Sequence, residues 1–271
     1  MRTVWLLGGI SALILLVGAL FGVVLVAAAV AALVVLYALF AADRIALRAM
    51  RARPVSQAER PELYRIVREL VTASRRPVPA LYLSATAAPN AFAVGRGPRR
   101  GAVCVTTGLL ELLDERELRA VLAHELSHIH RRDTLAACAA GALAGAIALV
   151  AGTAAVVGDD EESTAPLLVA VFGPVAALIV RLAVSRGREY RADADAVALT
   201  GDPDGLVSAL RKLEDGTRAA PLATRPAQLT QAHLMIANPF RAECALARRF
   251  ATHPPLESRI SRLRPPLGPR S

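Results

Sequence analysis

Residues 118–136 read LRAVLAHELSHIHRRDTLA and contain three of the five histidines in this chain of 271 residues. His124 and His128 are four residues apart, so on a helix their imidazole rings lie on one face. Apolar residues recur at helical spacing in the same stretch, at Leu118, Val121, Leu122 and Leu126. This periodicity predicts a helix. Two imidazoles on one helix face can share a single metal ion.

Glu125 follows His124 directly and lies about 100° further round the predicted helix, which sets its carboxylate beside the metal instead of on it. The pattern H-E-x-x-H is typical of zinc hydrolases, in which the glutamate acts as general base on a metal-bound water. The alternative is a surface helix that carries these letters without a metal. We read His130, which points away from this face, as a solvated surface histidine.

A catalytic zinc takes three protein ligands, so a third must come from elsewhere. Arg131 and Thr134 occupy the positions where one class of enzymes extends the motif with a glycine and a third histidine. A later glutamate is therefore expected. We favour Glu189, in SRGREYRADADAVAL, with Asp193 one turn further on the same face to accept a hydrogen bond from a ligand histidine. The alternative for both carboxylates is an ion pair with a nearby arginine (Arg186, Arg188 or Arg191).

Long apolar segments indicate a membrane protein, and 54% of all residues are hydrophobic. Residues 3–42 contain no charged side chain, and one helix of that length would extend about 60 Å across a hydrocarbon core of about 30 Å. We therefore predict two spanning helices that turn near residues 18–22. A cleaved signal peptide is the alternative, but its apolar region would be much shorter.

Residues 134–157 and 165–184 are two further apolar segments, each close to the ~20 residues that a spanning helix needs. The first contains Gly141-x-x-x-Gly145, a spacing that lets helices approach closely in lipid. A buried helical hairpin in a soluble core is the alternative. The expected fold class is mainly α with a small β-sheet, an α+β catalytic domain, plus about four membrane helices. The domain boundaries follow: an N-terminal transmembrane hairpin (1–42), the first part of the catalytic domain (43–133), a second hairpin (134–184), the second part (185–264) and a flexible tail (265–271).

The net charge of +9 comes from arginines that cluster beside the apolar segments. With four spans, the clusters at 44–53, 131–132 and 186–191 fall on one side of the membrane. An excess of basic residues marks that side as the cytoplasm. We therefore expect a multi-pass protein of the cytoplasmic membrane, in contact with the lipid bilayer, whose catalytic domain faces the cytoplasm. No nucleic-acid-binding motif is visible, so nucleic acid is excluded as a partner.

The region between the first hairpin and the histidines predicts a helix over 57–74 and then strand, loop, strand, turn, strand and helix over 79–113. Further short helices are expected at 203–215 and 255–263. We predict that Asn90, Ala91 and Phe92 begin an edge strand that pairs with an extended substrate peptide; an ordinary core strand is the alternative. His253 precedes Pro254 and is a candidate donor to a developing oxyanion, or else a structural residue.

The stretches HELSHIHRRD, SRGREYRADADA and THPPLESRISRL occur in this order with apolar segments between them. Together with PNAFAVGRG and VCVTTGLLELL they resemble the HtpX-type membrane metalloproteases of the M48 peptidase family, over nearly the whole chain to about Leu263. The resemblance implies a zincin-like fold and one zinc ion per chain. It also implies hydrolysis of polypeptide substrates, namely membrane or misfolded proteins, on the cytoplasmic side in protein quality control. It assigns the ligand and base roles by motif: His124, His128 and Glu189 as ligands, Glu125 as base.

One departure from the family pattern is the very short link between the first two predicted spans. Two other functions stay open: an inactive scaffold that keeps the metal for structure, and a protease that cleaves within the membrane. Charged residues flank the predicted histidine helix on both sides (Glu115, Arg116, Glu117, Arg119, Arg131, Arg132 and Asp133). A helix with such flanks belongs to the aqueous domain, which favours a membrane-anchored zinc endopeptidase.

Overall fold

The structure is a computed structural model, and it describes residues 40–140, 185–222, 234–237 and 254–263, with a few positions before residue 40. The predicted spans at 3–42 and 134–184 lie largely outside the described residues. His253 and the tail at 265–271 lie wholly outside them. Within the described part of the chain, no helix is both long enough and apolar enough to cross a bilayer.

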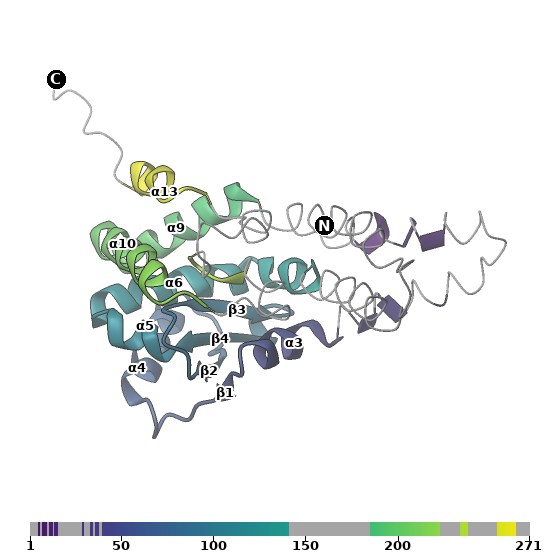
Figure 1. The fold of residues 1–271 in the computed structure, drawn as a ribbon, viewed down its shortest axis with the longest axis horizontal. Helices are drawn as coiled ribbons and strands as arrows, with labels where there is room; N and C mark the ends of the chain where they lie inside the picture. Colours follow the sequence, from purple (N-terminus) through teal and green to yellow (C-terminus); the bar gives the residue numbers. More distant parts are fainter. Residues whose placement is uncertain are drawn as a thin grey trace, which may run out of the picture.

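The described elements are mainly helices around one small sheet (Figure 1), as the sequence predicts. In chain order they are α3 (Ala42–Ala49), β1 (Arg53–Pro54), α4 (Pro61–Ala73), β2 (Ala80–Ser84), β3 (Ala91–Gly95), the 3₁₀ helix η1 (Pro98–Arg100), β4 (Gly101–Thr106), α5 (Thr107–Leu112), α6 (Glu115–His130), α9 (Arg186–Thr200), α10 (Pro203–Ala219) and α13 (Leu256–Leu263). The predicted series from the first strand to α5 is confirmed. The two-residue strand β1 was not predicted, because so short a segment carries no periodic signal.

The sheet has the strand order β1-β2-β4-β3. β2 and β4 are parallel, with Leu81 opposite Val103, whereas β3 and β4 are antiparallel, with Phe92 opposite Cys104. β1 joins the outer side of β2 in antiparallel fashion. β3 therefore forms the edge of the sheet at the end away from β1, which is the position that the sequence predicted for it.

Both faces of the sheet are covered, so its inner strands β2 and β4 are mostly apolar on both sides. Val103 and Val105 of β4 point into one core, which α4 and α6 cover, while Cys104 points into a second core on the side of α3. In β3 the same alternation places Ala91 and Ala93 in the first core and Phe92 and Val94 in the second. Successive side chains thus point into two different buried cores, and for that reason the strands are hydrophobic at nearly every position in the sequence.

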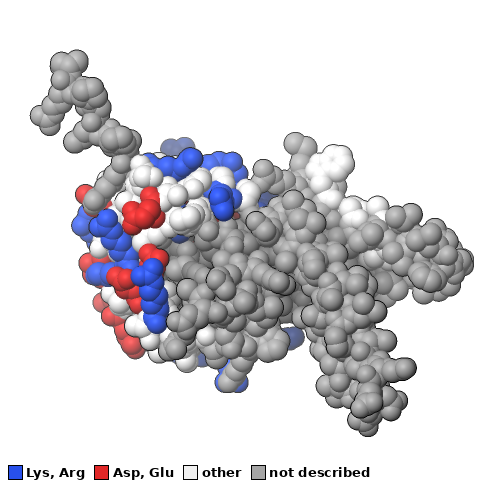
Figure 2. Space-filling model, turned by 45° about the horizontal axis from the view of Figure 1, so that its top comes forward, with Lys and Arg blue, Asp and Glu red and all other residues white. Residues whose placement is uncertain are grey.

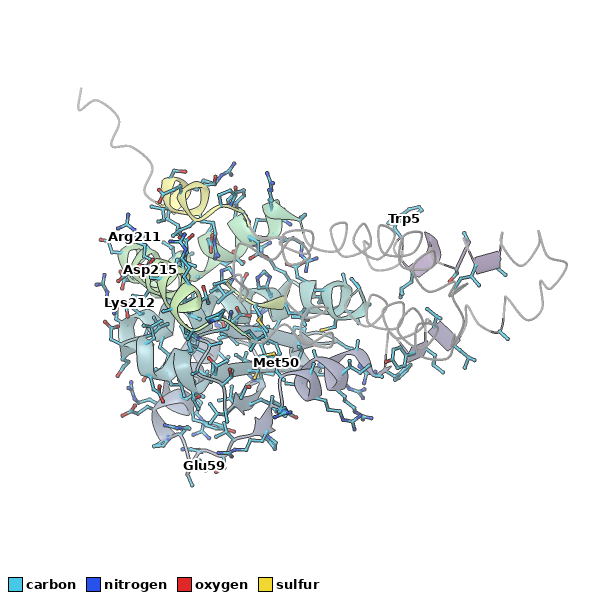
Figure 3. The ribbon with its side chains drawn as sticks, viewed as in Figure 1. Trp5, Met50, Glu59, Arg211, Lys212 and Asp215 are labelled. Carbon is cyan, nitrogen blue, oxygen red and sulfur yellow. The ribbon has the colours of Figure 1, made fainter. Side chains whose placement is uncertain are left out.

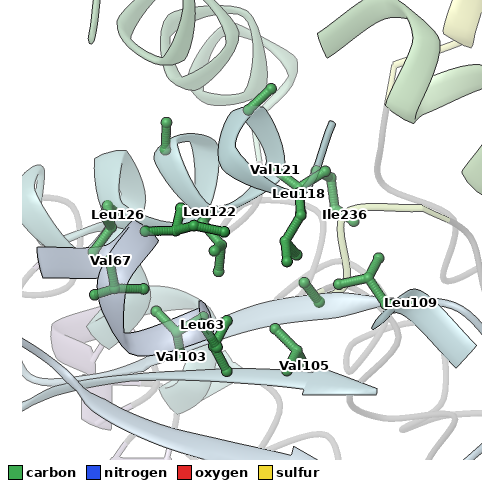
Figure 4. Packing of buried hydrophobic residues seen from close by; sticks show 14 of the residues in the cluster. Leu63, Val67, Val103, Val105, Leu109, Leu118, Val121, Leu122, Leu126 and Ile236 are labelled. Carbon is green, nitrogen blue, oxygen red and sulfur yellow. The ribbon is translucent and has the colours of Figure 1, made fainter. Parts of the chain in front are cut away.

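Helix α6 lies across the sheet and supplies the centre of the first core. Its residues Leu118, Val121, Leu122 and Leu126 point toward Val103 and Val105, as Figure 4 shows. These four leucine and valine side chains are 8% exposed or less. The apolar face that predicted the helix is thus the face that fixes it on the sheet, and its opposite face is left for α9.

The start of α6 is set by a capping box. The Asp114 side chain accepts a hydrogen bond from the backbone N–H of Glu117, and Glu117 Oε2 accepts one from the N–H of Asp114 at 3.0 Å. Such reciprocal bonds satisfy two backbone donors that a helix start leaves without partners. Glu117 also accepts hydrogen bonds from Ser208 at 2.6 Å and Lys212 at 2.7 Å. These bonds dock α10 against the first turn of α6.

The outer surface of the described domain carries charges of both signs. Figure 2 shows acidic and basic side chains next to one another on one face, and Figure 3 shows Arg211, Lys212 and Asp215 on the outside of α10. Exposed pairs such as Arg218–Glu214 at 2.6 Å contribute little stability, about 0–1 kcal/mol each. The stability of this domain therefore comes mainly from its buried core, to which α6 contributes several side chains.

Truncation of Leu122 tests that role of α6. Leu122 is 0% exposed, so Leu122→Ala leaves a cavity and should lower the free energy of unfolding by about 2–5 kcal/mol. Urea unfolding of the purified protein, followed by circular dichroism, measures the change. Val78→Ala is the control, because Val78 is 48% exposed and its truncation should change stability by less than about 0.5 kcal/mol. Equal losses in the two variants would contradict this account of the core.

Candidate metal centre and active site

Three predicted metal ligands converge between α6 and α9. His124 Nε2 lies 3.2 Å from His128 Nε2 and 3.7 Å from Glu189 Oε2, and His128 Nε2 lies 3.6 Å from Glu189 Oε1. His124 is 0% exposed and Glu189 is 3% exposed. One ligand atom from each of the three residues can be chosen so that all lie within 4.8 Å of one another. The fold brings together two segments that are more than sixty residues apart in the sequence.

These separations fit a tetrahedral metal site. Bonds of about 2.1 Å from zinc to nitrogen or oxygen place neighbouring ligand atoms about 3.4 Å apart. The two Nε2 atoms are 3.2 Å apart, and each makes its nearest approach to a different oxygen of the Glu189 carboxylate, 3.7 Å from His124 to Oε2 and 3.6 Å from His128 to Oε1. The carboxylate therefore faces both imidazoles at about the spacing that a shared metal needs. Two imidazoles and one carboxylate are also a donor set that catalytic zinc uses, with one position left open. The residues present therefore fit a divalent metal such as zinc.

The charges around the site also favour a cation. Among the described residues of the pocket and its surroundings, the acidic groups outnumber the guanidinium groups by two: Glu125, Asp133, Glu189 and Asp193 against Arg188 and Arg259. Burial alone lowers the pKa of His124, but the carboxylates of Asp193 and Glu189 outweigh that effect and raise it to about 9 in the absence of a metal. Positive charge at this position is thus stabilised by the protein.

Glu125, the predicted base, is 1% exposed and lines the same pocket as the three ligands. It belongs to α6, and because it follows His124 by one residue it lies beside the ligand face of the helix. The pocket is also lined by apolar side chains from three other segments: Ala93, Ala137, Leu234, Met235 and Ile236. A buried carboxylate next to a metal site with an apolar wall is suited to proton transfer on a bound substrate.

Asp193 lies where the sequence predicted it, one turn beyond Glu189. Its Oδ1 is 2.9 Å from His124 Nδ1, a contact that directs the other ring nitrogen, Nε2, toward the metal position. Its arginine partner is neither Arg188 nor Arg191, which the alternative interpretation had named. Instead, Arg259 of α13 donates two hydrogen bonds to the Asp193 carboxylate, at 2.9 and 2.6 Å.

This buried ion pair changes the acidity of Asp193. Although burial raises the pKa of Asp193, the charge and hydrogen bonds of Arg259 outweigh it and lower the pKa to about 2. Asp193 is therefore ionised at neutral pH, and its negative charge lies 2.9 Å from His124 Nδ1. Sequence reasoning missed Arg259, because a partner 66 residues away leaves no local signal.

A second carboxylate lies next to the other histidine. Asp133 Oδ2 is 3.7 Å from His128 Nδ1, and Arg188 lies 3.1 Å from Asp133 Oδ1 while its Nη2 donates to the Asp133 backbone carbonyl at 2.5 Å. Burial raises the pKa of Asp133, but His128 and Arg188 lower it below the ordinary value. Arg188 is thus engaged with Asp133, which weakens the alternative that it serves mainly as an ion-pair partner for Glu189.

Of the three predicted substrate-binding residues, Ala91 and Phe92 begin β3 and Asn90 directly precedes it. All three contact a segment of the same chain, Leu234–Ala237. Ile236 donates its N–H to the Ala91 carbonyl at 3.1 Å, Phe92 forms an isolated antiparallel bridge with Met235, and Asn90 Nδ2 donates to the Ala237 carbonyl at 3.0 Å. Asn90, Ala91 and Phe92 are each 1% exposed or less. Their role in substrate binding stays a prediction.

His130, which the sequence analysis placed on the surface, is partly buried, and burial lowers its pKa. The structure does not bring it to the metal cluster. The pocket lining by Leu234, Met235 and Ile236 was not anticipated. A short apolar run in an irregular stretch looks the same in sequence whether it lines a pocket or a core.

Two imidazoles, a carboxylate and a neighbouring acidic base around one pocket define the class of metal-dependent hydrolases. Comparison with known proteins makes this specific. The sequence profile of peptidase family M48 matches residues 57–267. The chain belongs to peptidase family M48, and it is a metalloprotease.

Relatives of this chain carry the description "Protease HtpX homolog". One, from Kineococcus radiotolerans, is 50% identical over 100% of this chain and 97% of its own length. Another, from an Arthrobacter species, is 44% identical over 97% of this chain and 94% of its own. A third, from Pelotomaculum thermopropionicum, is 42% identical over 96% of each chain. The resemblance that the motifs suggested is therefore confirmed along the whole sequence.

Asp195 offers a test of how α6 and α9 are held together at the site. It accepts hydrogen bonds from Ser127 at 2.6 Å and from Arg131 at 2.5 and 2.7 Å, and the bond from Arg131 lowers the pKa of Asp195. Because its folded pKa is depressed, its contribution is present above about pH 4, the ordinary aspartate value, and is lost as pH falls further. Asp195→Asn should therefore cost about 1 kcal/mol at pH 7 and less near pH 3, where the contribution of the charge has begun to be lost.

Unfolding by urea at the two pH values measures this difference. Asp215→Asn is the control, because the Asp215 side chain on α10 is 79% exposed and its replacement should change stability by less than about 0.5 kcal/mol at both pH values. A loss for Asp195→Asn that is the same at pH 3 and pH 7 would show that the pair does not act through charge.

Proposed function

We propose that this protein is a membrane-anchored zinc endopeptidase that cleaves membrane or misfolded proteins at the cytoplasmic face of the cell membrane, in protein quality control. The observation that carries the proposal is the convergence of His124, His128 and Glu189 within 4.8 Å, with Glu125 on the same pocket. We assign one zinc ion per chain to these three ligands. Two imidazoles and a carboxylate around an open position support zinc over harder cations, which prefer all-oxygen sites.

When bound, zinc supplies a Lewis acid that polarises a peptide carbonyl and makes a nearby water more acidic. Glu125 takes a proton from that water as it attacks the scissile carbon, and then delivers the proton to the departing amine. The Asp193 carboxylate, 2.9 Å from His124 Nδ1, favours the tautomer with the proton on that nitrogen. The negative charge of Asp133, 3.7 Å from His128 Nδ1, favours the corresponding tautomer of His128 without a hydrogen bond. The apolar wall formed with Leu234, Met235 and Ile236 limits the access of bulk water.

The arrangement of α6 supports catalysis in an aqueous domain and not within the bilayer. α6 packs on the sheet through Leu122 and its neighbours, and charged residues at both ends form ion pairs with other elements of the domain, including Arg65–Glu115 at 2.7 Å and Arg131–Asp195 at 2.5 Å. The predicted spans at 3–42 and 134–184 then anchor the two parts of the domain, 43–133 and 185–264. The arginine clusters next to them support a cytoplasmic orientation.

We further propose that the edge strand β3 guides an extended substrate, with contacts from Asn90, Ala91 and Phe92, and that His253 donates a hydrogen bond to the developing oxyanion. Position supports the first assignment, because β3 is the outer strand of the sheet and its Ala93 lines the pocket. Since Ala91 and Phe92 are paired with Ile236 and Met235, a substrate strand has to displace that segment to reach them. The second rests on the place of His253 directly before Pro254 and α13. An inactive scaffold is disfavoured, since every side chain that the reaction needs is present.

Replacement of the base tests the proposed reaction. Glu125→Gln removes the proton acceptor while leaving both histidines and Glu189 in place, so one zinc ion per chain should remain bound. Cleavage of casein or an unfolded membrane protein should fall by at least about 10²-fold. Metal analysis of detergent-purified protein and a peptide-release assay measure the two quantities side by side.

Glu115→Gln is the matched control, because Glu115 lies on the exposed first turn of the same helix and its replacement should leave both zinc content and cleavage unchanged. Unchanged cleavage by Glu125→Gln would end the proposed mechanism. A wild-type protein that binds equimolar zinc without any chelator-sensitive cleavage would support the scaffold instead.

The proposed topology can be tested by labelling with a membrane-impermeant maleimide. The background carries Cys244→Ser, and the two other native cysteines, Cys104 and Cys138, are buried and should not react. In this background Glu115→Cys should be labelled in inside-out membrane vesicles and not in intact spheroplasts. A cysteine placed at Glu161, in the acidic stretch between the third and fourth predicted spans, should give the opposite result. Labelling of both positions from the same side would refute the four-span arrangement.

A further inference from the structure

Arg259 is a buried arginine of α13 that ties two parts of the active site together. It is 3% exposed, and three of its nitrogens donate hydrogen bonds. Nε and Nη2 bind the Asp193 carboxylate at 2.9 and 2.6 Å, and Nη1 binds the Ile236 carbonyl at 3.1 Å. A buried guanidinium is costly unless its hydrogen bonds are made. Both partners of Arg259 are therefore held in defined positions.

The first partner, Asp193, connects Arg259 to the proposed metal ligand His124. Asp193 is 2% exposed, and the Oδ1 atom that accepts from Arg259 Nη2 is also 2.9 Å from His124 Nδ1. The position of this carboxylate decides how the His124 ring is turned, and therefore where Nε2 presents its lone pair. Arg259 binds both carboxylate oxygens, so it removes the rotation that a single hydrogen bond would leave to Asp193.

The second partner, Ile236, connects Arg259 to the pocket wall and to the edge strand β3. Ile236, whose carbonyl Arg259 binds, donates its own N–H to the Ala91 carbonyl of β3 at 3.1 Å. The preceding residue, Met235, pairs with Phe92 of the same strand. Leu234, Met235 and Ile236 line the pocket that contains His124 and Glu125. The Arg259 guanidinium is thus hydrogen-bonded both to Asp193, which contacts His124, and to Ile236, which lines the pocket.

We propose that Arg259 is a positioning residue that sets the orientation of His124 and the placement of the Leu234–Ala237 segment at the same time. The inference rests on the metal site and the function proposed above. Only arginine suits this role, because its planar fork presents several donors in fixed directions, whereas a lysine is a single point charge. Lysine at 259 balances the charge of Asp193 but cannot hold both carboxylate oxygens and the Ile236 carbonyl together.

The variant Arg259→Lys therefore separates positioning from simple charge balance. We expect it to fold, to bind zinc about 10–100-fold more weakly than the wild type, and to lose hydrogen-exchange protection in the peptide that covers 234–237. At saturating zinc, KM for a casein-derived peptide should rise because the wall is no longer fixed. Zinc competition with a chromophoric chelator, hydrogen exchange followed by mass spectrometry, and steady-state kinetics measure the three effects on the full-length protein in detergent.

Arg262→Met is the matched control on the same helix. Arg262 also joins α13 to α9, through a contact of 4.0 Å between its guanidinium and the Tyr190 ring, but within the described residues no hydrogen bond links it to Asp193 or Ile236. It should keep the zinc affinity and the exchange protection of the wild type. Arg259→Met leaves Asp193 without its cation, so it should lose more zinc affinity and more exchange protection than Arg259→Lys. If Arg259→Met does not fold, the inference is tested by Arg259→Lys alone.

Two outcomes would overturn the inference. One is an Arg259→Lys protein with the zinc affinity, KM and exchange protection of the wild type, which would reduce Arg259 to charge balance. The other is an equal loss in Arg262→Met, which would point to the docking of α13 in general. A wild-type protein that binds no zinc would instead refute the proposed function, and the exchange of residues 234–237 in metal-free protein would still test the bond between Arg259 and Ile236.

Discussion

The structure depends on keeping charged groups stable inside a small apolar domain. Glu125, Glu189, Asp193 and Arg259 are each 3% exposed or less, and an isolated charge at such a position would cost several kcal/mol. Each is placed within reach of a partner or of the metal position, and the acids outnumber the guanidinium groups around the pocket. Electrostatics of this kind favours a bound cation. The domain is therefore built around a cluster of side chains that could hold a divalent cation.

Hydrophobic packing makes this arrangement precise enough for chemistry. Helix α6 is fixed to the sheet by one face, through Leu122 and its neighbours, and the opposite face carries His124 and His128 toward α9. The capping box at Asp114 and Glu117 fixes where the helix begins. Because both the start and the packing of the helix are defined, His124 and His128 are held in fixed positions relative to α9, as a metal site would require.

Local patterns in the sequence predict most of this. The helical spacing of leucine and valine around His124 predicts α6, and the alternation of strands and turns over residues 79–113 predicts β2, β3, β4 and α5. H-E-x-x-H restricts the chemistry because two imidazoles four residues apart must share a helix face. The same rule placed Asp193 one turn beyond Glu189. All of these inferences depend on residues close to one another in the sequence, where the period of a helix or a strand decides which side chains share a face.

Contacts between distant segments could not be predicted in the same way. The pairing of Asp193 with Arg259, the bond from Arg188 to Asp133, and the position of residues 234–237 along β3 depend on how α9, α13 and the sheet pack. Nearby arginines were equally plausible partners in sequence. The sequence by itself therefore determined the helix, the metal-binding residue types and the family, because these follow from short-range spacing and from motifs. Only the tertiary structure decided which carboxylate supports which histidine and what forms the pocket wall. Those choices depend on burial, and burial is a property of the packed chain.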